Sequence, residues 1–483
     1  MLRFMTSGIG VLLGALHGFI SVPVYTGFLE VSEYGIMRIV LITVTLLQGP
    51  FSLRMANGFS VFAAGLKDKG ELSRQFLMGL AATCASMAFW TIVFVIVSPF
   101  VLPRQIHPYI WHILFMLYGY ILMNYSVTFI STFQMVLHST LAQTGQIYST
   151  MLLSIFFLYR GGRVESIFHA YMISCYSISI ILTAIILKRT GFSWKWNSPL
   201  LWKVVKFSVP LIPIALSGIV IQNLDQYFIL YYMDEKAVAI YGVATSLVFY
   251  MQSFIGAMLT TYNPTLFRLW GLKEYDRFRK YAWKANHFAV IFLGCSMLGL
   301  ALYAPTLIDI LARKKELREA SIYVIPLAAA LSFAVIGNLI LPFFYANKNS
   351  TVSLYVHLGG AALNCALNVL LIPGYGIMGA VWATIASYFC FFAALVFLSW
   401  KLMRIPYDFS FLARDAAVTV AFVFAADKFV AHFPSVPIRI AWGVPFAAGY
   451  ILALIVVRCL TREDFDFIRG LFRKKSDDNY SSG

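Results

Sequence analysis

Residues 24–35 read VYTGFLEVSEYG, and this stretch ends one long apolar run and begins the next. Two acidic residues mark the turn, and the second run begins at a Tyr-Gly pair that ends in Gly35. A related stretch, MDEKAVAIYG at 233–242, has the same order of an acidic turn followed by a Tyr-Gly pair that ends in Gly242. Because a membrane-spanning helix needs about 20 mainly apolar residues, each stretch predicts a tight turn between two such helices.

Outward from these turns, charged or Pro/Gly-rich breaks divide the chain into apolar segments long enough to span a bilayer. Of the 483 residues, 60% are hydrophobic and 12% are charged, whereas a soluble chain carries roughly 25% charged residues. The sequence therefore predicts an all-α polytopic membrane protein. About fourteen transmembrane helices are expected, at 5–29, 34–65, 77–101, 109–134, 141–159, 166–187, 207–232, 237–261, 285–304, 319–346, 351–372, 377–399, 414–431 and 438–457.

The two related turns indicate an internal repeat. Six predicted spans separate them, so both copies have the same orientation, which is typical of transporters with two lobes; chance remains the alternative for so short a match. We expect an N-terminal lobe of spans one to six, an interfacial linker, a C-terminal lobe of spans seven to twelve, two further spans and a cytoplasmic tail. These parts occupy residues 1–187, 188–206, 207–399, 400–458 and 459–483.

Two connections, 188–206 and 262–284, combine Trp and Tyr with basic residues. This composition is typical of amphipathic helices that lie at the lipid interface, and we expect one in each connection.

The net charge of +16, from 37 Lys and Arg against 21 Asp and Glu, is best explained by topology rather than by nucleic acid. Cationic connections remain on the cytoplasmic side of a membrane, and here they alternate with less basic ones. Both termini are therefore predicted to be cytoplasmic. The basic segment 313–318 falls on the predicted outer side and opposes this trend, so the sequence leaves its side open.

Motifs of soluble enzymes are absent or out of context. GYGIMG at 374–379 fits a dinucleotide fingerprint, but it joins two predicted membrane helices instead of following a strand. Asp464-Phe465-Asp466 lies in a short charged tail, and the chain has no P-loop motif. The six cysteines form no metal-ligand pattern. No metal site and no cofactor are predicted, and a coupling ion, H+ or Na+, is left open.

Arg54 is the first candidate for function, because a charge at membrane depth usually faces a wet cavity or a partner. It follows Gly49-Pro50 in the second span, where proline is expected to kink the helix toward a central cavity. The alternative is an arginine that extends to the inner interface.

The seventh span carries a polar cluster that includes Asn223 and Asp225. At 1.5 Å per residue, Asp225 lies about 12 Å below the outer loop and Arg38 about 6 to 7 Å below it. The two could pair and latch the lobes together at the outer side. The alternative is that Asp225 makes only local hydrogen bonds while Arg38 reaches lipid headgroups.

His17 in the first span is a further cavity candidate, although a hydrogen-bonded core histidine is the more common case. Lys206, Arg268 and Lys284 lie at predicted cytoplasmic helix ends and are expected to attract an anion inward. Anchoring at the lipid interface is the alternative for all three.

Several stretches resemble bacterial polysaccharide flippases of the O-antigen (Wzx-like) type, over essentially the whole chain. They are VYTGFLE at 24–30 with SEYG at 32–35, NLDQYF at 223–228 with IYG at 240–242, Asn263-Pro264, and NVLLIPGYGIMGA at 368–380. These flippases belong to the multidrug/oligosaccharidyl-lipid/polysaccharide exporter superfamily, which also includes the lipid II flippase and multidrug extruders.

The resemblance implies a transporter, not an enzyme, that alternates access around a central cavity in the bacterial inner membrane. Its cargo would be an undecaprenyl-diphosphate-linked oligosaccharide for O-antigen or lipopolysaccharide synthesis, moved from the cytoplasmic to the periplasmic leaflet. Membrane lipids, a polysaccharide polymerase and a chain-length regulator are the implied partners. Few basic residues lie deep in the spans, which favours a neutral or weakly charged glycan.

Two other functions stay open. An ion-coupled exporter of organic cations would need an acidic cavity, and the sequence offers Asp225 as the only clear acid in mid-span. A glycan polymerase or ligase would need a large outer loop, and the predicted outer connections are short.

Overall fold

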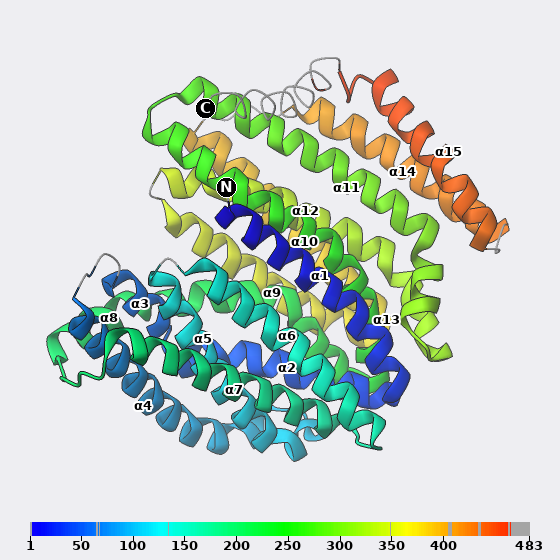
Figure 1. Cartoon of the computed structure of the whole chain (residues 1–483). Helices are drawn as coiled ribbons and strands as arrows, with labels where there is room; N and C mark the ends of the chain where they lie inside the picture. Colours follow the sequence, from blue (N-terminus) through cyan, green and yellow to red (C-terminus); the bar gives the residue numbers. More distant parts are fainter. Residues whose placement is uncertain are drawn as a thin grey trace, which may run out of the picture.

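The computed structural model describes residues 2–63, 66, 68–133, 135–347, 349–403, 408–432, 436–461 and 464. This part of the chain is helical and contains no strand, as predicted (Figure 1). The elements are α1 (Leu2–Phe28), α2 (Val31–Ser52), α3 (Met55–Ala63), α4 (Lys69–Val101), η1 (Arg104–Tyr109), α5 (Ile110–Thr132), α6 (Val136–Tyr159), α7 (Val164–Thr190), α8 (Ser198–Ser208), α9 (Leu211–Tyr232), α10 (Glu235–Gly271), α11 (Tyr275–Leu311), η2 (Lys315–Glu319), α12 (Ala320–Ala346), α13 (Ser350–Met403), α14 (Phe409–His432) and α15 (Val436–Val456).

Every predicted span coincides with helical structure. By length and composition, eleven helices in the described residues can cross a membrane, and α13 contains two predicted spans joined at a kink. The kink lies at Gly376, with φ 57° and ψ −138°, and glycine adopts such left-handed backbone without strain. The tail from 465 onward lies outside the described residues.

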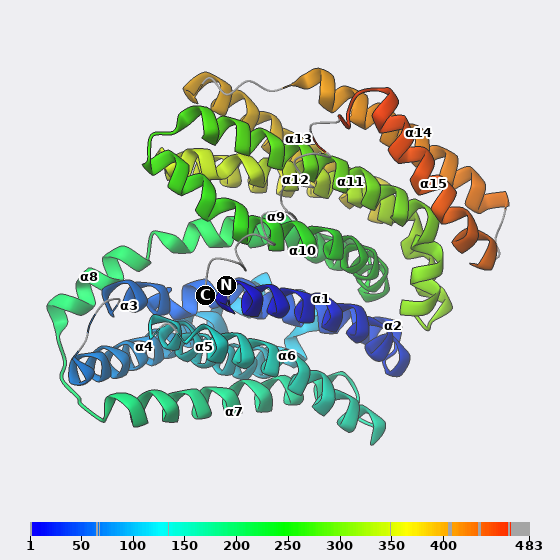
Figure 2. The ribbon, with the colours of Figure 1, turned by 45° about the horizontal axis from the view of Figure 1, so that its top comes forward.

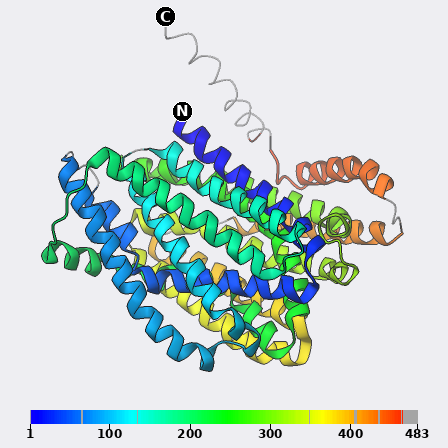
Figure 3. The same cartoon turned by 60° about the horizontal axis from the view of Figure 1, so that its bottom comes forward.

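Two groups of helices form the body of the molecule. Figure 2 shows α1 to α7 on one side and α9 to α13 on the other, with α8 in the connection between them. The accessory pair α14 and α15 packs on α11 at one edge of the bundle, and its orange and red ribbons remain at an edge in Figure 3.

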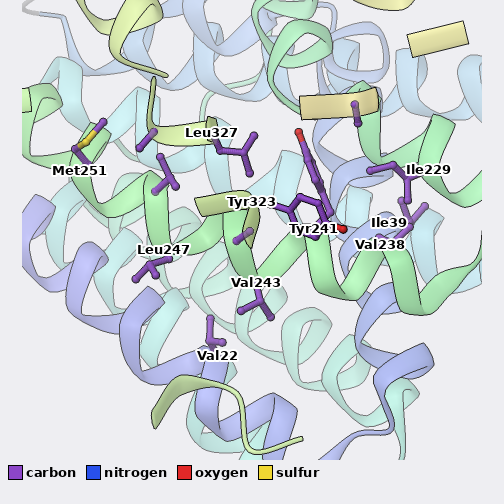
Figure 4. Packing of buried hydrophobic residues seen from close by; sticks show 14 of the residues in the cluster. Val22, Ile39, Ile229, Val238, Tyr241, Val243, Leu247, Met251, Tyr323 and Leu327 are labelled. Atoms are coloured by element: carbon purple, nitrogen blue, oxygen red, sulfur yellow. The ribbon is translucent and has the colours of Figure 1, made fainter. Parts of the chain in front are cut away.

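Apolar side chains of both groups meet in one core. Figure 4 shows Val22 of α1 and Ile39 of α2 near Ile229 of α9 and Val243 of α10. All four side chains are buried in the same cluster. Because lipid tails are as apolar as these side chains, the contact stabilises the arrangement through van der Waals packing rather than through removal of apolar surface from water.

The predicted interfacial helix at 262–284 is wrong. The segment extends α10 to Gly271 and starts α11 at Tyr275, so it forms the end of an antiparallel pair of long helices. The reason is packing: Tyr262 is buried and stacks on Tyr281 with ring centroids 5.8 Å apart. The other interfacial prediction corresponds to α8, whose Trp202 is exposed and whose Val204 is buried.

Candidate functional site

The two Tyr-Gly turns meet each other across the molecule. Helices α2 and α10, which begin at these turns, pack together, and both glycines lie in the contact. A Cβ at Gly35 would overlap the backbone carbonyl of Glu235, and a Cβ at Gly242 would overlap the side chain of Arg38. Glycine at both positions is therefore what allows the two helices to approach so closely.

Arg38 of α2 forms hydrogen bonds with the opposite group of helices. Its Nε donates to Oε1 of Gln226 on α9 at 3.0 Å. Its Nη1 donates to Oγ of Ser246 at 2.9 Å, and its Nη2 donates to Oγ1 of Thr245 at 3.2 Å, both on α10. These three bonds join the two groups through one planar guanidinium, whose fixed fork of donors suits several acceptors at once.

Asp225 of α9 has local partners instead. Its carboxylate accepts a hydrogen bond from the Tyr241 hydroxyl and another, at 2.9 Å, from the backbone N–H of Gln226. Among the ion pairs of the described residues there is none between Asp225 and Arg38. The expected direct latch is therefore not formed: Tyr241 occupies the carboxylate, and Arg38 reaches the neighbouring Gln226.

Asp225 and Arg38 do line one cavity of about 600 Å³ between the two groups of helices. Its surface combines aromatic rings with amide and hydroxyl groups, which can donate and accept hydrogen bonds without carrying charge. The polar and aromatic residues that line it are His17, Ser21, Tyr25, Tyr34, Arg38, Thr45, Gln146, Thr150, Tyr171, Gln222, Asn223, Asp225, Gln226, Tyr241, Thr245, Ser246, Phe249, Thr384 and Tyr388.

His17 and Asn223 also face this cavity. The ring of His17 lies edge-on to Tyr148 at 5.8 Å between centroids. Asn223 donates from Nδ2 to the Ile219 carbonyl at 3.2 Å. Four of the five residues predicted to line a cavity, Arg38 and Asp225 among them, are thus brought together here.

Arg54 is outside the residues that line this cavity. It sits with Leu53 in a break between α2 and α3, where both residues have left-handed backbone with φ of 53° and 45°. The Arg54 Nε is buried and has no hydrogen-bond partner among the described residues. A kink after Pro50 was expected; the structure instead ends the helix at Ser52, and Arg54 lies in the break before α3.

The three residues predicted to attract an anion are also separate from the cavity. Lys206 lies in the last turn of α8 and is exposed, Arg268 is exposed near the end of α10, and Lys284 is half-buried on α11. None of them lines the 600 Å³ space.

Sequence reasoning missed the acceptors of Arg38. Thr245 and Ser246 follow Gly242 by three and four residues, so they lie one helical turn beyond it, on the face that glycine presents to α2. Applying this helical spacing to both Tyr-Gly turns would have identified Thr245 as the counterpart of Arg38.

The basic segment 313–318 lies at the same end of the bundle as the turn at Glu30. Lys314 Nζ is 3.8 Å from Glu30 Oε1, and the Thr26 hydroxyl donates to the Leu311 carbonyl at 3.0 Å. We call this region, Thr26–Glu30 with Leu311–Lys314, the closed end. Partnership with Glu30, and the ion pair of Arg318 with Asp309 at 2.7 Å, account for basic residues on this side.

Comparison with known proteins identifies the fold. The MatE family model matches residues 210–370. An uncharacterized membrane protein of Methanocaldococcus jannaschii is 25% identical over 310 residues, which are 61% of this chain and 59% of that relative. The chain thus matches less than two thirds of that relative's length.

Two solved structures are similar over most of their length. The lipid II flippase MurJ in an inward closed conformation has a TM-score of 0.72 at 14% identity, covering 98% of this chain and 99% of MurJ. An inward-facing multidrug resistance MATE family transporter of the MOP superfamily has a TM-score of 0.67 at 14% identity, covering 82% and 94%. The chain is therefore a multi-pass membrane protein with the all-α fold of MOP-superfamily transporters.

Proposed function

We propose that this protein is a transporter that moves an undecaprenyl-diphosphate-linked oligosaccharide from the cytoplasmic to the periplasmic leaflet of the bacterial inner membrane. The cavity between the two groups of helices carries this proposal. Its volume of about 600 Å³ is within the roughly 300–1,000 Å³ typical of small-molecule sites.

The lining of the cavity suits a glycan. Gln222 and Asn223 offer amide groups, which match the donors and acceptors of sugar hydroxyl groups. Gln226, Thr245 and Ser246 also line the cavity but are engaged with Arg38 in this state. The aromatic rings of Tyr34 and Tyr388 add flat apolar faces for the sugar rings. The single arginine in the lining, Arg38, is compatible with a neutral or weakly charged repeat unit.

Arg54 is the proposed ligand for the diphosphate. A guanidinium binds phosphate oxygens through paired hydrogen bonds, and the buried Nε of Arg54 lacks a protein partner within the described residues. The break at Leu53 and Arg54 interrupts the helix on the predicted cytoplasmic side of the cavity, where a lipid-linked substrate would enter. Lys206, Arg268 and Lys284 would raise the local concentration of an anionic headgroup at this side.

The contacts of Arg38 and of the closed end, both on the predicted outer side, support an inward-facing state. Arg38 and the pair of Glu30 with Lys314 join the two lobes on the predicted outer side. Alternating access would require these contacts to break while the cytoplasmic side closes. A polysaccharide polymerase and a chain-length regulator remain the proposed partners on the periplasmic side.

An ion-coupled exporter of organic cations is the second candidate. Asp225 lies in the cavity together with the aromatic rings of Tyr25, Tyr34, Tyr241 and Phe249, and aromatic faces attract cations. Against this, the Asp225 carboxylate already accepts two hydrogen bonds, which leaves less of its charge for a ligand.

Reconstitution in proteoliposomes tests both functions. A fluorescent polyprenyl-diphosphate disaccharide should become accessible in the opposite leaflet at least tenfold faster with the protein than without it. Arg54→Ala should abolish this increase, whereas Arg160→Ala, which removes an exposed arginine, should not. Ethidium transport without lipid transport would contradict the flippase and favour the exporter.

A further inference from the structure

A second buried acid lies outside the cavity, on the accessory helix α14. Asp415 is 4% exposed although it belongs to a helix that can span a membrane. In the sequence it lies at the boundary of the predicted span 414–431, next to Arg414. Helix α14 packs on α11 and α15, at the edge of the bundle that Figure 1 shows in orange and red.

In the described part of the chain, the carboxyl group of Asp415 forms no ion pair. Its Oδ1 is buried without a hydrogen-bond partner within the same residues. The adjacent Arg414 points elsewhere: its Nε donates to the Ser410 carbonyl at 3.2 Å and its Nη1 to the Val457 carbonyl at 2.8 Å. Asp225, by comparison, has two donors.

The groups that face Asp415 from neighbouring elements are neutral. They are Cys295 on α11, Tyr450 on α15 and Cys459 beyond α15. The Tyr450 hydroxyl forms a 2.8 Å hydrogen bond with Thr419, one turn further along α14. An isolated carboxylate is expensive to hold in such surroundings, whereas a neutral carboxylic acid is not.

A second cavity lies about one helical turn from this acid. It has a volume of about 320 Å³ and is lined by Phe411 and Leu412 of α14 and by Asp408 just before α14. The polar residues that α11 contributes to the lining are Arg279, Lys280, Asn286 and His287. Asp415 follows Leu412 by three residues and Phe411 by four, so it lies on the face of α14 that lines the cavity, about one turn further along the helix. The space is far larger than one water requires, and the buried Oδ1 of Asn286 has no partner in the described chain.

We propose that Asp415 is a proton-binding site. In the state that this structure represents, Asp415 holds a proton as a neutral acid. Water that enters through the cavity of about 320 Å³ accepts this proton as hydronium, which leaves the carboxylate. The reverse transfer restores the neutral acid. If the protein is the transporter proposed above, this exchange supplies a coupling proton, and only that role rests on the proposed function.

Dicyclohexylcarbodiimide tests the site without a transport substrate. It adds to a protonated carboxyl in apolar surroundings and gives a stable N-acylurea that retains the whole reagent mass. Mass spectrometry of the vesicle-embedded protein should find the adduct on Asp415, with a yield that falls as the pH rises. Asp415→Asn, which keeps the shape of the neutral acid, should fold and lose the adduct. Asp427→Asn, which changes an exposed acid on the same helix, should retain it.

The results separate the site from its role. An unlabelled Asp415 at every pH, or equal labelling of Asp427, would overturn the proton site. In proteoliposomes, a pH gradient should accelerate lipid transport by wild type, and Asp415→Asn should lose that acceleration while it retains transport without a gradient. An unchanged gradient response would overturn the coupling role, and absence of transport in wild type would count against the proposed function instead.

Discussion

The two Tyr-Gly turns have the same backbone role and different chemistry. In α2, three residues after Gly35, the chain carries Arg38; in α10, three residues after Gly242, it carries Thr245. Sixteen residues before Tyr241 is Asp225, its hydrogen-bond partner, whereas the corresponding position before Tyr34 is Gly18. One half thus supplies the cation, and the other supplies the acceptors and the acid.

This difference shows how two repeated turns can form an asymmetric contact. The glycines provide close contact in both halves, while the polar residues at equivalent positions are complementary instead of identical. The contact can therefore be specific without a direct ion pair, which at membrane depth would be costly to separate in each cycle.

Exchanging the two charges should have the largest effect on this comparison. In Asp225→Arg with Arg38→Asp, the new arginine would occupy a site that is 2% exposed and would face Tyr241 instead of an acid. We expect the free energy of unfolding to fall by about 4 kcal/mol, as for an uncompensated buried charge. The double variant should be no more stable than the less stable of the two single variants. Thermal unfolding in detergent measures this; recovery in the double variant would show that the two side chains act as a direct pair.

A side chain at Gly35 should be nearly as damaging. The Cβ of Gly35→Val would meet the Glu235 backbone, which cannot rotate away. Overpacking of this kind costs about 3 kcal/mol. The control is Gly299→Ala, because a Cβ there has no atom within 4 Å. Equal melting temperatures for the two variants would contradict the close approach of α2 and α10.

Removing the guanidinium alone should have a smaller effect. Arg38→Ala loses three hydrogen bonds at the edge of the cavity. We expect the free energy of unfolding to fall by about 2 kcal/mol. The variant should populate the outward-open state more than wild type, seen as faster labelling of Thr245→Cys by a membrane-impermeant maleimide in a background free of native cysteines. Labelling as slow as in the parent Thr245→Cys protein would mean that Arg38 does not hold the lobes together.

The exposed pair at the closed end should contribute least. Glu30 is 75% exposed and Lys314 is 32% exposed, and such pairs contribute about 0.5 kcal/mol. Glu30→Gln should therefore change the melting temperature little, and the change should vanish at high salt. A large loss that persists in salt would show that this pair, and not Arg38, is the main tie.

The sequence predicted where the helices lie along the chain, but not how each helix is rotated about its own axis. Long apolar runs with charged breaks located the helices, whereas the Tyr-Gly repeat predicted an internal repeat and not the contact between its two turns. The predicted depths of Arg38 and Asp225 do not tell which way a side chain points about its helix axis. Arg38 binds Gln226, the residue that follows Asp225. Asp225 itself accepts a hydrogen bond from Tyr241 on the neighbouring helix α10.

Tertiary packing explains the remaining differences. The aromatic and basic residues at 262–284 have the composition of an interfacial helix, yet Tyr262 and Tyr281 stack and extend two spanning helices. The break at Leu53 and Arg54 has no strong local signal beyond Pro50. Asp415 lies beside Arg414 at a predicted boundary, but in the fold Arg414 donates to the Ser410 and Val457 carbonyls instead.

The separation of the lobes at the closed end tests the central account most directly. Spin labels at Glu30→Cys and Lys314→Cys, in a background without native cysteines, would report this distance by double electron–electron resonance. The account predicts one short distance in the resting protein and a second, longer population when a polyprenyl-diphosphate disaccharide is transported. A single short distance under conditions of active transport would contradict alternating access between these two groups of helices.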